Sequence, residues 1–201
     1  MNKILKDTII ITVITLVSGC LLGLVYEITK DPIAKAQYNA QQDAYKAVFE
    51  SAESFEDYGS FAEDSDAVVT LVEFPETDVI GTVEAKDKSG ETIGYVITTV
   101  SHSGYGGDIT LSVGVQMDGT LNGYAITSIS ETAGLGMKAK DEKFTSQFEN
   151  KLVDSFAVTK DTPASDNQIE AISGATITSD AVTDAVNAGL AYFQRILEGG
   201  A

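Results

Sequence analysis

A run of 19 uncharged residues near the N-terminus constrains this 201-residue chain more than any other feature. The run extends from Thr8 to Tyr26 and consists mainly of Ile, Leu, Val and Thr. At about 1.5 Å per residue, a helix of this length is close to the roughly 30 Å thickness of the hydrocarbon core of a bilayer. We therefore expect a single transmembrane helix, with Tyr26 as an aromatic anchor at the membrane interface.

The charges that flank this run do not decide its orientation. Lys3 and Lys6 precede it, and Lys30 and Lys35 follow it, so the positive-inside rule gives no preference. Because a short N-terminal head generally stays in the cytoplasm, we expect a single-pass protein of the cell membrane. The large domain that follows Tyr26 is then extracytoplasmic.

A lipoprotein cleavage site is the alternative interpretation of the same run. The sequence Val-Ser-Gly-Cys at 17–20 follows a short apolar stretch with Lys3 and Lys6 before it. However, six apolar residues follow Cys20, whereas a mature lipoprotein generally turns polar directly after its first cysteine. We therefore expect an uncleaved anchor, and modification of Cys20 stays an open question.

The charge and the cysteine content exclude several classes of partner and site. The chain has 13 basic and 30 acidic residues, for a net charge of −17, and the imbalance lies after Thr29. Such an acidic domain would be repelled by nucleic acid and by anionic lipid. One Cys and one His cannot form a disulfide framework or a Cys/His metal cluster within this chain, so we expect no metal site.

The hydrophobic periodicity predicts an α+β fold, in which an antiparallel sheet flanked by helices follows the transmembrane helix. Asp31-Pro32 is a typical helix start, and we expect a helix over residues 33–55. The acidic stretch from Glu50 to Asp66 is expected to be a loop or a short helix. The predicted division is into a head and transmembrane helix (1–29), an amphipathic helix and acidic connector (30–66), and a larger domain that contains the sheet (67–201).

A period of two residues then indicates at least four strands. Two turn sequences, Asp-Lys-Ser-Gly at 87–90 and Met-Asp-Gly-Thr at 117–120, predict hairpins between them. The expected strands are Val79–Lys86, Glu91–Ser101, Asp108–Met117 and Leu121–Ile129.

Two helices are expected in the last third of the chain. One covers residues 143–150, with Phe144 and Phe148 facing inward. The other covers residues 180–197, has one apolar face, and ends at Gly199-Gly200. The lysines between 138 and 151 form the only basic cluster. They would either offset a bound phosphate or keep the domain soluble, and both interpretations stay open.

The segment Ser173-Gly174-Ala175-Thr176 lies before the C-terminal helix. Thr178 and Ser179 are good N-cap residues, which places Thr176 just ahead of the helix N-terminus, where free N–H groups favour a phosphate. The four-residue segment alone is common among proteins. The longer string Ser-Gly-Ala-Thr-Ile-Thr-Ser resembles the flavinylation motif of the G subunit of the Rnf complex. It is also similar to that of the C subunit of the sodium-translocating NADH:quinone reductase.

The resemblance implies FMN bound covalently to Thr176 through a phosphoester, which would make the chain a phosphoprotein and a flavoprotein. Ser173, Gly174, Ala175 and Thr178 would surround the attachment point. Glu170 stands three positions before Ser173, where the family more often has Asp.

Two further loops resemble flavin-contacting loops of the same family. Glu-Thr-Ala-Gly-Leu-Gly at 131–136 is similar to the family pattern Glu-Thr-Pro-Gly-Leu-Gly, and Ala133 in place of Pro loosens the turn. Its glycines expose N–H groups, and Leu135 offers an apolar side chain to a ring. The loop Gly-Tyr-Gly-Gly at 104–107 would otherwise be a flexible hairpin loop, and His102 beside it is expected to be structural. The residues of these loops expected to bind the cofactor are Glu131, Thr132, Gly134, Leu135, Gly136, Gly104, Tyr105 and Gly106.

The function that the resemblance implies is electron transport by a membrane-anchored flavoprotein of an Rnf-type, ion-translocating ferredoxin:NAD oxidoreductase complex. The chain would act as an electron-transfer subunit of this translocase and would have no catalytic residues of its own. It has no Gly-x-Gly-x-x-Gly segment after a strand and no cysteine set for an iron–sulfur cluster, so partner subunits would hold those groups. A flavin transferase would attach the FMN. A free-standing extracytoplasmic flavoprotein and a flavin-free surface-binding module are the alternatives.

Overall fold

The structure, a computed structural model, describes residues 3–64, 67–197 and 199, and it forms two compact units. The first unit covers residues 1–40 and the second covers residues 41–201. The domain boundaries expected after Thr29 and Asp66 stay predictions, and Ser65, Asp66 and Gly200 lie outside the described residues.

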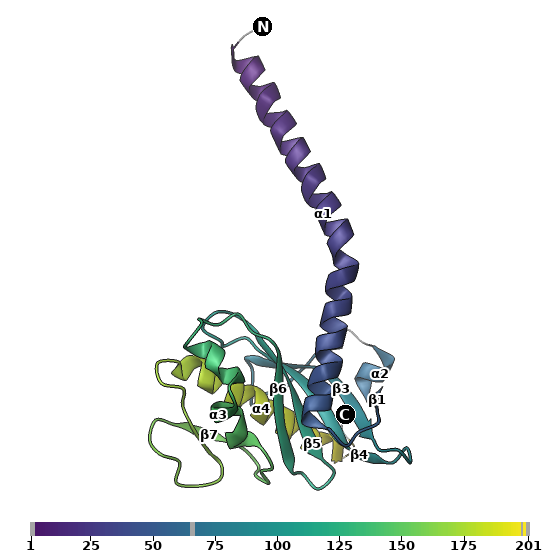
Figure 1. The fold of residues 1–201 in the computed structure, drawn as a ribbon, viewed down its shortest axis with the longest axis vertical. Helices are drawn as coiled ribbons and strands as arrows, with labels where there is room; N and C mark the ends of the chain where they lie inside the picture. The colour runs from purple at the N-terminus through teal and green to yellow at the C-terminus, as the bar shows by residue number, and fades with distance from the viewer. Residues whose placement is uncertain (1–2, 65–66, 198, 200–201) are drawn as a thin grey trace. The chain divides into compact units, whose positions relative to one another are not determined.

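The first unit consists of the N-terminal part of helix α1, which extends from Lys3 to Val48 (Figure 1). Within the described part of the chain, this is the one helix long and apolar enough to cross a membrane. The hydroxyls of Thr8, Thr12 and Thr15 each donate to the carbonyl four residues earlier, at 2.9 Å. These polar side chains are therefore satisfied within the helix, as an apolar environment requires.

The prediction of a separate helix starting at Asp31 and ending at Phe55 is wrong at both ends. Helix α1 continues through Asp31 and Pro32 and ends at Val48. A proline removes only one hydrogen bond from a helix interior, and a long helix on both sides tolerates that loss. The helix ends before Phe49 because the next residues turn into a short strand, β1, at Ser54–Asp57.

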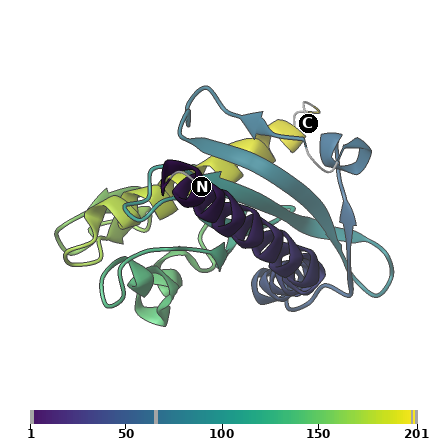
Figure 2. The same cartoon turned by 90° about the horizontal axis from the view of Figure 1, so that it is seen from above.

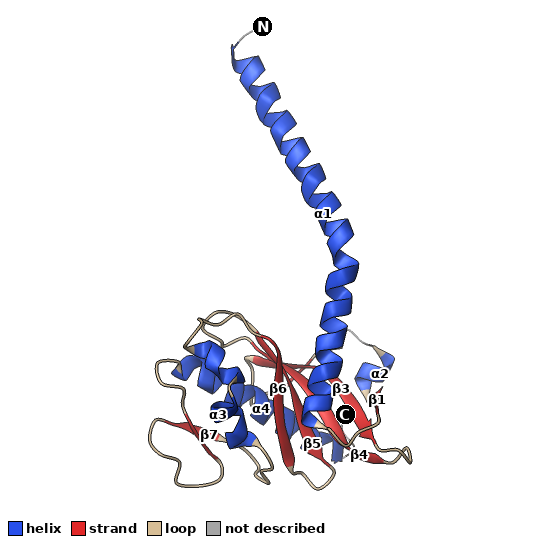
Figure 3. Ribbon diagram, viewed as in Figure 1, coloured by secondary structure: helices blue, strands red, loops and turns tan. Residues whose placement is uncertain are grey.

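The second unit is built on a six-stranded antiparallel sheet with the order β1-β3-β4-β5-β6, in which β2 (Val69–Thr70) also pairs with β3 (Figure 3). The four long strands are β3 (Thr77–Lys86), β4 (Thr92–Ser101), β5 (Ile109–Gln116) and β6 (Leu121–Ser128). They match the predicted strands to within two residues at each end. The short strands β1 and β2, and helix α2 (Ser60–Glu63) between them, carry no clear periodic pattern, and the two strands were not predicted.

Helix α4, Thr176–Leu197, packs along one face of the sheet against β3, β4 and β5 (Figure 2). The predicted apolar face of this helix is confirmed, because all of its members are buried. These are Val182, Ala185, Val186, Leu190, Phe193 and Ile196. Alternate residues of β4 and β5 complete this main core, which therefore fixes α4 and its N-terminus relative to the sheet.

A smaller cluster on the sheet consists of Tyr45, Val48 and Phe49 from the end of α1 with Val83, Ala85 and Val96. This contact requires glycine in the strands beneath it. A Cβ atom on Gly114 would lie 2.7 Å from the Val48 Cβ, and one on Gly94 would lie 2.4 Å from the Phe49 Cζ.

The segment between β6 and α4 contains short elements in place of the single helix expected at 143–150. They are the 3-10 helices η1 (Gly136–Lys140) and η2 (Ser146–Phe148), helix α3 (Glu142–Thr145), and the parallel strands β7 (Ala157–Thr159) and β8 (Gln168–Glu170). Phe144 and Phe148 are buried, as predicted. The parallel pair was not predicted, because three-residue strands give no periodicity signal.

Candidate functional site

Helix α4 begins at Thr176, four residues earlier than the expected start at Asp180. Ser179 explains the early start, because its side chain holds the turn before the helix. Its Oγ accepts from the Ile172 N–H at 2.9 Å and donates to the Ala175 carbonyl at 3.0 Å. Gly174 supplies the left-handed backbone that this turn needs, with φ of 79°. Thr178 and Ser179 therefore lie inside the first turns of α4, and their expected role as N-caps is wrong.

This start places Thr176 in the first turn of α4, and its side chain is half-buried. The N–H groups of Thr176, Ile177 and Thr178 have no acceptor within the helix, because the first turn of any α-helix leaves its donors free. The positive end of the helix dipole points the same way. Thr176 therefore carries its hydroxyl at a position suited to a phosphate.

Three segments far apart in the sequence meet at this helix start and enclose an open cleft of about 640 Å³. They are the loop after β4, the loop after β6 and the first turn of α4. The lining residues are Tyr105, Glu131, Thr132, Leu135, Gly136, Gly174, Ala175, Thr176, Ile177 and Thr178.

Nine of these lining residues were expected from the sequence, and Ile177 was missed. Ile177 directly follows Thr176 in the motif, and this position could have indicated that it lines the site. Four expected residues do not line the cleft: Ser173, Gly104, Gly106 and Gly134.

Glu131 connects two of the loops. Its side chain is only 9% exposed, and its Oε1 accepts a hydrogen bond from the Gly106 N–H at 3.2 Å. Gly106 has to be a glycine here, since a Cβ would lie 2.3 Å from the Ser130 carbonyl oxygen. Gly106 thus supports the cleft from behind without lining it.

Gly136 occupies the tightest point of the cleft wall. A Cβ at this position would lie 2.6 Å from the Thr178 Oγ1 and 2.7 Å from the Glu131 Oε2. The absence of a side chain brings the loop after β6 against the first turn of α4 and leaves these two polar groups beside the cleft. Thr178 is 1% exposed, and its hydroxyl forms no hydrogen bond with any residue that the structure describes.

The rim of the cleft carries three apolar side chains that remain largely exposed. Tyr105 is 72% exposed, Ile177 is 52% exposed and Leu135 is 42% exposed. Apolar side chains around a concave site with a few polar groups are typical of a site for a flat organic ligand. The cleft therefore combines apolar walls, polar groups and a helix N-terminus.

His102 holds the base of the loop that carries Tyr105. Its Nδ1 lies 3.0 Å from the Asp108 Oδ1, and its Nε2 lies 3.1 Å from the Asp78 Oδ2. These hydrogen bonds raise the pKa of His102 above its usual value, and the bond to Asp108 has the larger effect. The pKa of Asp78 is lowered, chiefly by a hydrogen bond from Thr70. This geometry matches the structural role expected for His102.

Comparison with known proteins places this cleft in a recognised domain. The FMN-binding domain family matches residues 104–191, and the RnfG N-terminal region matches residues 1–48. The crystal structure of Shewanella oneidensis NqrC has the same fold, with a TM-score of 0.53 and 17% sequence identity over 73% of this chain and 82% of that chain.

Two curated relatives match along nearly their whole length. The G subunit of the proton-translocating ferredoxin:NAD(+) oxidoreductase complex of Clostridium ljungdahlii is 34% identical, over 92% of this chain and 89% of that protein. The G subunit of the Na(+)-translocating complex of Acetobacterium woodii is 30% identical, over 96% of this chain and 93% of that protein. The resemblance expected from the sequence motifs is confirmed, and the chain belongs to the family of G subunits of the Rnf ion-translocating oxidoreductase complexes.

Proposed function

We propose that this chain carries electrons in an ion-translocating ferredoxin:NAD oxidoreductase complex, through an FMN esterified to Thr176. The observation that carries the proposal is the cleft at the start of α4, which has Thr176 in its wall. This cleft lies within the residues that match the FMN-binding domain family. The relatives from C. ljungdahlii and A. woodii bear the names of subunits of such complexes.

The residues of the cleft fit a flavin. An isoalloxazine needs apolar walls and a few polar partners, and Tyr105, Leu135 and Ile177 offer the apolar surface. The Thr178 hydroxyl and the carboxylate of Glu131, which both lie beside Gly136, are polar groups in its wall. A flavin held here would supply reversible electron transfer, while the protein would orient it and exclude water.

Thr176 suits a covalent link better than Ser173 does. The Thr176 side chain lines the cleft, whereas Ser173 is exposed and lies outside it. An ester at Thr176 would put the phosphate at the N-terminus of α4, where free N–H groups and the helix dipole stabilise its negative charge. A tethered carrier cannot diffuse away from its partners between electron transfers.

The remaining parts of the proposal concern the setting of the site. Helix α1 would anchor the chain in the cell membrane through residues 8–26, with the second unit on the extracytoplasmic side. Other subunits would hold the NAD site and the iron–sulfur clusters, and a flavin transferase would attach FMN during maturation. In that reaction the Thr176 Oγ1 would form a bond to the FMN phosphorus of FAD, and the hydroxyl proton would be released to solvent. The bond from that phosphorus to the oxygen bridging the two phosphates would break, and AMP would leave with the electron pair.

Replacement of Thr176 by Val tests the attachment site, with Ser173→Ala as the matched control. Thr176→Val keeps the size of the side chain but removes the hydroxyl, so in-gel flavin fluorescence and the mass gain of one FMN less water should disappear. Ser173→Ala should retain both signals. Fluorescence that survives in Thr176→Val would show that the attachment site is wrong.

The same preparation separates the alternative functions. A wild-type chain without flavin absorbance would support a flavin-free surface-binding module. A flavinylated chain that never copurifies with other membrane subunits would support a free-standing flavoprotein.

A further inference from the structure

His102 joins both ends of the loop that carries Tyr105 and attaches them to a third strand. The loop covers residues 103–107 and is here called the Tyr105 loop. His102 lies directly after β4, and its Nδ1 lies 3.0 Å from the Oδ1 of Asp108, the residue that follows the loop. Its Nε2 lies 3.1 Å from the Oδ2 of Asp78 on β3. The ring therefore closes the base of the loop and ties it to the sheet.

Both of these hydrogen bonds need a protonated ring. An ionised carboxylate only accepts hydrogen bonds, and a neutral imidazole has one N–H and one lone pair. Loss of the proton therefore leaves either Asp108 or Asp78 facing a lone pair. Whichever hydrogen bond is lost, the base of the loop keeps only one of its two attachments through the ring.

The groups around the ring set its charge near neutral pH. The chain has one histidine, the side chain type whose ordinary pKa lies between pH 5 and 8. The carboxylates of Asp108 and Asp78 raise the pKa of His102, and partial burial opposes them. Strand β2 contributes the hydroxyl of Thr70, which donates to Asp78, and the carbonyl of Glu76 accepts the backbone N–H of His102 at 2.9 Å. The ring is therefore protonated in mildly acidic solution and loses its proton as the pH rises through a value above 6.5.

The Tyr105 loop connects this ring to the cleft. A Cβ on Gly104 would lie 2.2 Å from the Gly107 carbonyl oxygen, so the loop is folded tightly on itself. At its tip, the Gly106 N–H donates to the Oε1 of Glu131 at 3.2 Å, and Tyr105 lines the cleft with a largely exposed side chain. A change at the base of so short a loop therefore reaches both Tyr105 and the hydrogen bond to Glu131.

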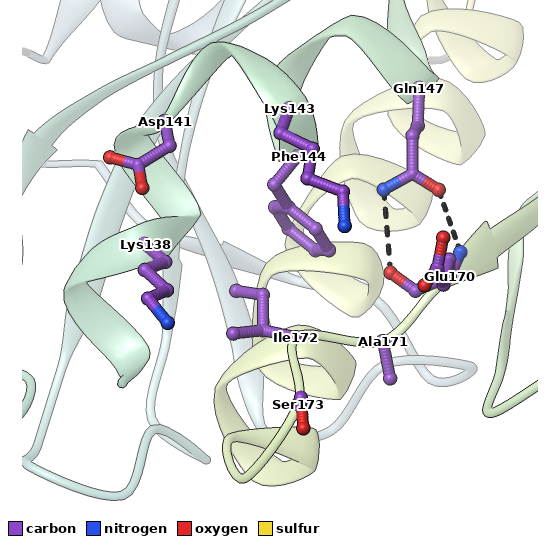
Figure 4. Close-up of a pocket in the computed structure, with 9 residues that line it drawn as sticks. All are labelled: Lys138, Asp141, Lys143, Phe144, Gln147, Glu170, Ala171, Ile172 and Ser173. Atoms are coloured by element: carbon purple, nitrogen blue, oxygen red, sulfur yellow. Dashed lines mark hydrogen bonds between the residues drawn. The ribbon is translucent and has the colours of Figure 1, made fainter. Parts of the chain in front are cut away.

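The other two segments at the cleft are held without a histidine. Uncharged side chains hold the turn before α4: the hydroxyl of Ser179, and the amide of Gln147, which makes two hydrogen bonds to the backbone of Glu170 at 2.7 and 3.3 Å (Figure 4). The loop after β6 is closed by backbone hydrogen bonds to the Thr132 carbonyl. A change of pH near neutrality therefore acts on the cleft through the Tyr105 loop.

We propose that His102 is a positioning residue: its protonated ring holds Tyr105 at the cleft, and loss of the proton loosens the Tyr105 loop and changes the surroundings of the flavin. The proposal rests on the FMN site proposed above. It makes that site sensitive to the pH on the side of the membrane where the domain lies.

The two Tyr-Gly pairs of the chain allow the loop to be observed directly by NMR. They are Tyr58-Gly59 and Tyr105-Gly106. Full-length chain in detergent, labelled with [1-¹³C]tyrosine and [¹⁵N]glycine, therefore gives amide correlations only for Gly59 and Gly106, and ¹³C-labelled histidine adds the single resonance of His102. We expect the Gly106 signal to shift with the same midpoint pH as the His102 resonance. The Gly59 signal is the internal control and should stay constant.

The absorbance of the FMN-loaded chain is the second readout. The flavin bands should change between about pH 5.5 and 8.5, with the midpoint of the His102 resonance. His102→Gln carries no charge and should show the high-pH spectrum of the wild type throughout. His102→Arg keeps a positive charge and several N–H donors, so it should show the low-pH spectrum throughout.

Two carboxylate variants test whether the ring and the flavin titrate together. Asp108→Asn removes the partner with the largest effect on the pKa of His102, so the midpoints of the His102 resonance and of the flavin bands should fall by the same amount. Asp118→Asn is the matched control, because it removes the same charge at the β5–β6 turn, at the opposite end of β5. It should leave both midpoints unchanged.

A constant Gly106 signal across the titration of His102 would overturn the proposal, because the ring would then lose its proton without affecting the loop. Flavin bands that do not change with pH, or that change equally in His102→Gln and the wild type, would overturn it too. The Gly106 measurement needs no flavin and can be repeated on the Thr176→Val chain. A wrong attachment site, seen as fluorescence that survives in that variant, is thereby distinguished from a failure of the pH coupling, seen as a constant Gly106 signal.

Discussion

Gly136→Ala is the sharpest test of the cleft geometry. The added Cβ would lie 2.6 Å from the Thr178 Oγ1, 2.7 Å from the Glu131 Oε2 and 2.8 Å from the Glu131 Cβ. Contacts below 3.0 Å are essentially never seen for a real Cβ, so the Thr178 hydroxyl alone must move by at least 0.4 Å. Both neighbouring side chains are buried and have little room to do so.

Overpacking of this kind typically costs about 1–3 kcal/mol. Gly134→Ala is the matched control, because Gly134 lies in the same loop and a Cβ there would meet nothing within 4 Å. Gly134 has φ of 77°, so alanine at this position is strained by about 1–2 kcal/mol without altering the cleft wall. The two variants should therefore lose similar stability but differ in their effect on the ligand.

The assay compares the full-length chains in detergent by urea unfolding and by the visible absorbance of the flavin. Both variants should have a lower unfolding midpoint than the wild type. Only Gly136→Ala should also change the shape of the flavin absorbance bands, because Glu131 and Thr178 move beside the ring. Identical flavin spectra for Gly136→Ala and the wild type, with stability reduced in both variants, would refute the proposal that the ring lies beside Glu131 and Thr178.

Three further predictions concern the hydrogen bonds of His102, the buried amide of Asn187 and the side of the membrane on which the domain lies. The folded-state pKa of His102 is raised, so its contribution to stability is fully present below the unfolded value of 6.5 and is lost as pH rises through the folded value. His102→Gln should therefore flatten the pH dependence of the unfolding midpoint above pH 6.5. An unchanged pH dependence would mean that the hydrogen bonds of His102 to Asp108 and Asp78 do not stabilise the fold. Asn187→Leu leaves the N–H and the carbonyl of Phe156 unpaired, and each should lower the free energy of unfolding, measured with urea, by about 1–3 kcal/mol. A total loss below about 1 kcal/mol would mean that these two hydrogen bonds do not stabilise the fold. Protease added to intact cells stripped of their outer layers should cut the domain after Tyr26, and protection until lysis would reverse the predicted topology.

The long strands and the C-terminal helix could be predicted from the sequence because each has a local pattern. Strands β3 to β6 have eight or ten residues each, which is long enough for a period of two to be recognised. Two Asp-containing turns mark their ends, with the Asp87 Oδ1 accepting from the Ser89 N–H at 2.8 Å. The strands β1, β2, β7 and β8 have two to four residues each and exist only through their partners. No periodicity can develop over such lengths.

The start of α4 could not be predicted from the sequence for a different reason. Thr178 and Ser179 are good N-cap residues by local preference, yet both are buried inside the first turns of the helix. Ser179 satisfies the backbone of Ile172 and Ala175 instead and so holds the turn before the helix. This use of Ser179, which N-cap preferences do not predict, moved the helix start and brought Thr176 into the first turn.

Local sequence was enough to specify the long apolar helix, the strand pattern and the three loops that resemble flavin-binding segments, because each of these consists of consecutive residues. Which residues of those loops share a cleft depends instead on the folded domain. Glu131 reaches the Gly106 N–H, and Gly136 meets Thr178, across separations of 25 and 42 residues. Such contacts depend on where the sheet and α4 place the loop ends, which no local pattern of side chains encodes.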